Sequence, residues 1–91
     1  MTYHRSVIDW IGQHTGLGDI LAPIKSTEYV RARAVAIKLI TESGIGTCEA
    51  ARLFKREPKT IRHAINTWPH LWAKDGAAMR IYRAAQAHLA E

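Results

Sequence analysis

The basic and polar side chains of this chain that could bind a ligand gather around a break in a helical pattern. The segment 49–65, EAARLFKREPKTIRHAI, begins as an amphipathic helix, breaks at Glu57-Pro58 and resumes with alternating basic and apolar residues. Arg and Lys side chains donate to phosphates and to guanine, and Asn binds adenine through two hydrogen bonds. The side chains in or next to this segment with such chemistry are Lys55, Arg56, Lys59, Thr60, Arg62, His63 and Asn66.

The net charge of +5 has a single source along the chain. Between Val30 and Ile65 there are eight basic residues and three acidic ones, whereas the rest of the chain has five of each. A localised basic block is the electrostatic footprint of a protein that binds a polyanion. A charged run can also be an ordinary solvated face, but here the block coincides with the helix break.

The sequence contains no constellation typical of an enzyme or a metal site. The glycine-rich stretch 44–46 lacks the lysine that follows in a phosphate-binding loop, and no pair of carboxylates is placed for acid–base work. His63 has no His or Cys one turn away, as a zinc site would require. We expect Cys48, the single cysteine, to pack as a small core residue rather than to act as a nucleophile. We therefore predict no enzyme activity, no cofactor and no metal.

Length and composition predict one small domain over residues 1–91. Of the residues, 47% are hydrophobic and 23% are charged, which is ordinary for a globular chain. No apolar run approaches the roughly 20 residues of a membrane span. The opening MTYHRSVIDWIGQHTG has a polar residue every few positions, unlike a signal peptide. One cysteine permits no internal disulfide, so we expect a cytoplasmic protein. The basic block suggests association with the nucleoid, and the lack of a long apolar run predicts no membrane partner.

The chain shows no strand alternation and no hairpin signal, so we predict an all-α fold of about five to six helices. Ser6 is expected to cap a first helix that weakens at Gly12 and Gly16, and Asp19 to open a short turn. A second helix is expected from Ser26 or Thr27 to about residue 43, ending at two glycines. The apolar positions expected to face inward are Val7, Ile8, Ile11, Val30, Ala34, Ile37 and either Ile40 or Leu39.

The second half of the chain predicts three more helices. Thr47 is a suitable N-cap for a helix over residues 48–55. Pro58 suits the first position of the next helix, which should run to about Trp68. A last helix is expected over 76–91, with an apolar side that either closes the core or offers a surface to a protein partner.

Two short helices joined by a tight turn, the second able to lie in a groove, form a helix-turn-helix. Ala51 is small, as the first helix must be where the second crosses it, and Ile61 is expected to return to the core. The glycine common in such turns is absent, and Lys55-Arg56-Glu57 stands there. On a helical wheel, the face opposite the apolar residues carries Lys59, Arg62, His63 and Asn66, with Thr60 and Thr67 at its flank.

VRARAVAIKLI (30–40), followed by the segment 49–65, resembles the C-terminal DNA-binding domain of the bacterial replication initiator DnaA. That domain belongs to the Trp-repressor-like helix-turn-helix group. The resemblance covers about Val7 to Trp68. The likeness implies a duplex DNA binder in which Arg33 enters the minor groove and Arg31 supports it on the backbone.

The resemblance also implies roles for residues near the break. Arg56 and Glu57 match an Arg-Asp pair at the start of the recognition helix. Thr60 matches a major-groove contact, and His63 matches a histidine that touches phosphate. The chain departs from the family where Pro58 replaces a base-reading histidine, where Lys59 replaces a threonine, and in a turn one residue shorter. These departures argue against the family's usual target sequence but not against its mode of binding.

Several functions fit these features. The leading hypothesis is a sequence-specific duplex DNA-binding transcription regulator, such as an activator of the phage or gene-transfer-agent type, because no ATPase module accompanies the domain. A replication-control protein that occupies initiator-type boxes is an alternative. A protein–protein adaptor with a basic face is another, and an RNA binder is disfavoured by the lack of a stacking platform.

Overall fold

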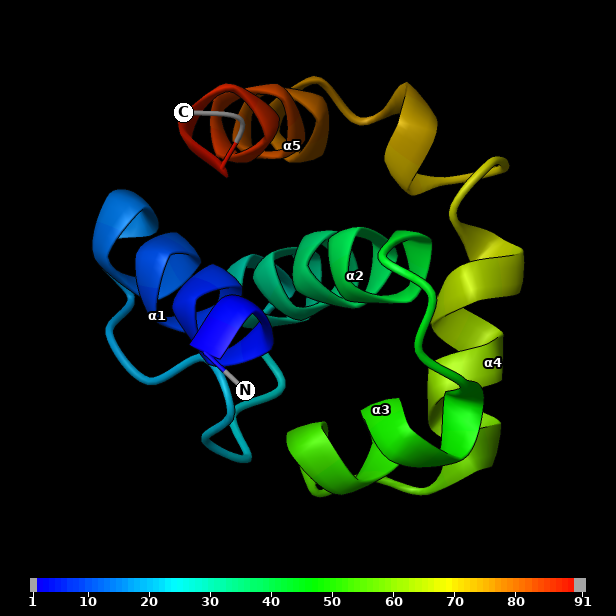
Figure 1. The fold of residues 1–91 in the computed structure, drawn as a ribbon. Helices are drawn as coiled ribbons and strands as arrows, with labels where there is room; N and C mark the ends of the chain where they lie inside the picture. Colours follow the sequence, from blue (N-terminus) through cyan, green and yellow to red (C-terminus); the bar gives the residue numbers. More distant parts are fainter. Residues whose placement is uncertain (1, 90–91) are drawn as a thin grey trace.

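The computed structural model describes residues 2–89, which form five α-helices and one 3-10 turn (Figure 1). No strand is present in this range. The predicted all-α fold with a helix-turn-helix is confirmed. The elements are α1 (Thr2–Thr15), α2 (Thr27–Glu42), α3 (Thr47–Phe54), α4 (Pro58–Thr67), η1 (Trp72–Lys74) and α5 (Gly76–Leu89).

Helix α2 is the central element and packs against α1, α3, α4 and α5 (Figure 1). Its sequence is rich in Ala, Val, Ile and Leu, so it can bury residues on several sides. Val35 and Ile40 of α2 are fully buried, as are Ile11 of α1, Phe54 of α3 and Ile61 of α4. This shared core holds α3 and α4 at a fixed angle to the rest of the domain.

Helix α1 differs from the prediction at its start. It begins at Thr2, so Ser6 lies exposed within the helix instead of capping it. No Gly or Pro precedes Ser6 to stop the helix from extending backwards. Gly12 does not weaken the helix, which continues to Thr15, and Gly16 follows with a φ of 78°. The predicted Asp19 turn is confirmed, because Asp19 Oδ1 accepts a 3.0 Å hydrogen bond from the Leu21 N–H.

Helices α2 and α3 bring three further corrections. Val30, predicted to face inward, is 38% exposed, because it lines an open groove between α2 and α4 and not the closed core. Gly46 rather than Thr47 is the N-cap of α3. Cys48 is exposed and does not pack in the core, because the buried side of α3 runs through Ala50, Ala51 and Phe54, which Cys48 does not share.

Asp75 directly precedes the last helix, α5, and its Oδ1 accepts a 3.0 Å hydrogen bond from the Ala78 N–H in the first turn. This bond lowers the pKa of Asp75, as does the charge of Arg31. Residues 90–91 of the predicted last helix lie outside the described residues. Tyr82 of α5 donates to both carboxylate oxygens of Glu42, at 2.7 and 3.0 Å, and so joins α5 to α2.

Within residues 2–89 no helix combines the length and apolar character needed to cross a membrane.

Candidate nucleic-acid interface

The turn between α3 and α4 is closed by backbone hydrogen bonds. The Arg56 N–H donates to the Ala51 carbonyl at 3.0 Å, and the Lys55 N–H donates to the Arg52 carbonyl at 3.3 Å. These two bonds form a Schellman motif, which requires a residue in the left-handed conformation at its centre. Lys55 takes that role with φ 55° and ψ 44°, where a glycine usually stands.

Helix α4 starts at Pro58, as predicted, with Glu57 as its N-cap. Proline fits the first helical position because its missing N–H would have no partner there. The predicted division of faces is confirmed: Ile61 is fully buried, and Trp68 just after the helix is 6% exposed. The exposed side chains of α4 are Lys59, Thr60, Arg62, His63 and Asn66.

The exposed side of α4 consists of two neighbouring stripes. Lys59, Arg62 and Asn66 follow one another at helical spacing and face outward. Thr60 and His63 form a second stripe with Thr67, and this stripe faces α2. Thr67 Oγ1 and His63 Nε2 lie 3.4 Å apart. The outer stripe therefore offers cationic and amide groups, and the inner stripe offers hydroxyl and imidazole groups.

The end of α4 is anchored by Trp68. Its ring centre lies 5.3 Å from that of Tyr82 on α5, and Lys38 Nζ of α2 lies 5.8 Å from the same ring. These contacts join α4 to both α2 and α5, so its exposed face is held on a rigid support.

A groove with a volume of about 240 Å³ runs between α2 and α4. Its floor is apolar, and among the described residues that line it none is acidic. Arg33 of α2 and Arg56 of the turn both line it. The full lining is Val30, Arg33, Ala34, Ile37, Phe54, Arg56, Thr60, His63, Ala64, Thr67, Leu71 and Trp72.

The guanidinium groups of Arg33 and Arg56 are held by backbone carbonyls. Arg56 donates to Phe54 at 2.9 Å and to Leu21 at 3.3 Å, which fastens the 17–25 loop to the turn. Arg33 donates to the carbonyl of Ile24. Burial lowers the pKa of Arg33, and the nearby charge of Arg56 lowers it further. The structure thus brings these two predicted site residues together.

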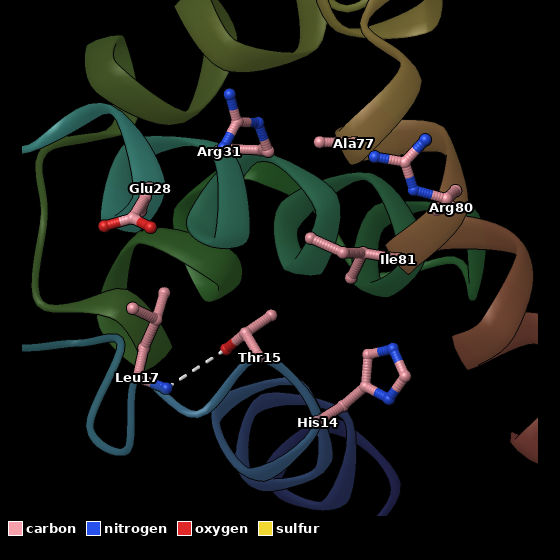
Figure 2. Close-up of a pocket in the computed structure, with 8 residues that line it drawn as sticks. All are labelled: His14, Thr15, Leu17, Glu28, Arg31, Ala77, Arg80 and Ile81. Atoms are coloured by element: carbon pink, nitrogen blue, oxygen red, sulfur yellow. Dashed lines mark hydrogen bonds between the residues drawn. The ribbon is translucent and has the colours of Figure 1, made fainter.

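Arg31 lies apart from Arg33, although two positions separate them on α2. Its Nε lies 3.4 Å from Asp75 Oδ1, and it lines a second cavity of about 330 Å³ between α1, α2 and α5. Figure 2 shows Arg31 at this cavity together with Ala77 and Arg80 of α5. The structure therefore does not bring Arg31 together with the other candidate residues.

Among the described residues, the basic side chains around α4 have no acidic partner. Within residues 2–89, no ion pair involves Arg33, Lys55, Arg56, Lys59 or Arg62. Glu57 is exposed at the start of α4 and makes no side-chain capping hydrogen bond. No group of three or more potential metal ligands occurs in the described part of the chain. The arrangement can donate several hydrogen bonds to an extended anion.

Some residues of this region carried no sequence signal. Leu71 lines the groove and is 48% exposed, but it follows Pro69 in a stretch without periodicity. The carbonyls of Leu21 and Ile24 that receive the two arginines are backbone groups, which side-chain patterns do not reveal.

Comparison of this chain with protein-family models, with curated proteins and with solved structures finds no match. The resemblance to the DnaA domain therefore stays a prediction from the motifs alone.

Proposed function

We propose that this protein is a sequence-specific duplex DNA-binding protein that regulates transcription. The observation that carries the proposal is the exposed side of α4, which presents Lys59, Arg62 and Asn66 in one stripe on a rigidly anchored helix. An α-helix fits the major groove of B-form DNA, where such side chains distinguish base pairs.

In this proposal the groups around α4 have two separate tasks. The outer stripe contacts base edges, with Arg62 and Lys59 suited to guanine and Asn66 to adenine. Thr60 makes a further major-groove contact. Lys55 and His63 contact phosphates beside the helix and fix its position without reading sequence. Glu57, at the N-terminal end of α4, accepts a hydrogen bond from the amino group of cytosine in this proposal.

A role in replication control uses the same surface and differs only in the target. Binding to the box of a replication initiator would favour that role. A protein–protein adaptor would instead use the basic face for an acidic partner.

The apolar side of the last helix, α5, was the other surface predicted for a protein partner. It is half-buried at Ile81 and Tyr82, so much of it already closes the core.

The proposal is tested by measuring binding of a labelled duplex as a function of salt. With about six phosphate contacts, affinity should fall about a thousandfold between 50 and 200 mM salt. Lys55→Ala should reduce the slope of log affinity against log salt by about one, whereas Arg83→Ala on α5 should not. Absence of duplex binding at moderate salt would favour the adaptor.

A further inference from the structure

The groove between α2 and α4 combines features that one chemical class would satisfy. Its floor is formed by Ala34, Ile37, Phe54 and Trp72, and its cationic groups are Arg33 and Arg56. Such a surface fits a molecule with an anionic group next to an apolar one. The sugar–phosphate chain of a nucleic acid alternates these two elements.

An anion in the groove would stabilise both arginines. Neither forms an ion pair within residues 2–89, and Arg33 Nε is buried without a hydrogen-bond partner. A buried donor without an acceptor costs free energy, and two neighbouring cations repel one another. One anion between the guanidiniums would offset the repulsion, and it would give Arg33 Nε an acceptor if that side chain turned toward it. One guanidinium can donate two parallel hydrogen bonds to the oxygens of a phosphate, so a phosphate suits these arginines well.

Exposed apolar side chains beside the arginines favour a strand of DNA over a small free anion. Val30 is 38% exposed and Leu71 is 48% exposed, and both line the groove. A free phosphate would leave them in water, whereas a deoxyribose would cover them. The inner stripe of α4, with Thr60 and His63, lines the same groove, so a strand beside α4 would pass over it.

We propose that Arg33 and Arg56 share one phosphodiester of bound DNA, with the adjoining deoxyribose on the apolar floor of the α2–α4 groove. This inference rests on the proposed function. It gives Arg33 a role different from the minor-groove contact that the DnaA resemblance implies. Its guanidinium is turned back onto the carbonyl of Ile24, next to Arg56, and not extended away from the domain.

The test uses a duplex that the protein has selected from random sequences. Phosphates of this duplex are replaced singly by methylphosphonate, which removes the charge. One replacement should weaken binding of the unaltered protein about tenfold or more, as expected for the loss of charged hydrogen bonds. In Arg33→Lys, Arg56→Lys and the double variant, the same replacement should have a clearly smaller effect. Arg31→Lys, on the same helix but paired with Asp75, is the matched control and should respond like the unaltered protein.

A second set of duplexes carries 2,6-diaminopurine in place of single adenines, which adds an amino group to the minor groove. If Arg33 reads the minor groove, one such duplex will bind more weakly to the unaltered protein but not to Arg33→Lys. That result, or a methylphosphonate effect equal in all variants, would overturn the shared phosphate while leaving the proposed function standing. Absence of any selected motif would overturn both. Thermal unfolding of each variant checks the fold, and if Arg56→Lys unfolds, Arg33→Lys alone decides.

Discussion

The N–H of Arg56 donates to the carbonyl of Ala51 at 3.0 Å, and this bond closes the turn of the helix-turn-helix. The bond forms because Lys55, between them along the chain, takes a left-handed backbone conformation. The turn therefore contains the usual bond pattern of a helix C-terminus without its usual glycine. The same turn holds Arg56 where its guanidinium reaches the carbonyl of Leu21.

Replacing Lys55 by glycine should stabilise the domain. A side chain in the left-handed region costs about 1–2 kcal/mol, and glycine would remove this cost. Glycine also has more freedom in the unfolded chain, which offsets part of the gain in stability. We expect Lys55→Gly to raise the free energy of unfolding by about 0.5–1 kcal/mol, measured by urea denaturation. Lys55→Ala removes the same charge but keeps a side chain at this φ, so it should not stabilise. Equal stability of the two variants would contradict a strained turn.

Gly12 is required by a close approach of backbone. The Gly18 N–H donates to the Gly12 carbonyl at 3.0 Å, and a methyl group at Gly12 would overlap the Gly18 carbonyl oxygen. We expect Gly12→Ala to destabilise the domain by about 1–3 kcal/mol, measured by thermal unfolding. Gly76→Ala is the control, because its added carbon has ordinary space and Ala favours a helix. If Gly12→Ala were as stable as Gly76→Ala, the close approach would be refuted.

The contact between Tyr82 and Glu42 makes stability depend on pH in the alkaline range. Burial, the hydrogen bond to Glu42 and its charge raise the pKa of Tyr82 to about 12, from an ordinary value of about 10. The folded state holds the phenol proton more tightly than the unfolded state. The resulting stability is fully present below about pH 10 and is lost as the pH rises through about 12.

Tyr82→Phe isolates this effect, because it removes the titrating hydroxyl and keeps the ring beside Trp68. We expect the stability advantage of the unaltered protein over Tyr82→Phe to shrink between pH 10 and 12, measured by urea denaturation at several pH values. Glu42→Gln should weaken the same dependence. A constant difference across this range would show that the phenol titrates alike in both states.

The sequence predicted α4 well because local rules decide it. Pro58 marks its first position, and the spacing of Ile61, Ala64, Ile65 and Trp68 separates a buried from an exposed face. The exposed candidates of α4 follow from that face.

The partners of the arginines could not be predicted, because they depend on tertiary structure. Arg31 and Arg33 stand two residues apart, but one meets Asp75 and the other meets Ile24 and Arg56. Helical spacing predicts that the two side chains point in different directions, but it does not predict which group each one contacts. The position of Cys48 was missed for a related reason, since the buried side of a short helix is set by the elements that cover it.

Selection of random duplex DNA by the purified protein shows whether α4 reads a DNA sequence. We expect one enriched motif, which Arg62→Ala should blur or abolish without lowering thermal stability, because Arg62 is exposed on α4. Arg83→Ala, exposed on α5, should select the same motif as the unaltered protein. Weak binding without enrichment, or a motif unchanged by Arg62→Ala, would contradict a sequence-reading role for α4.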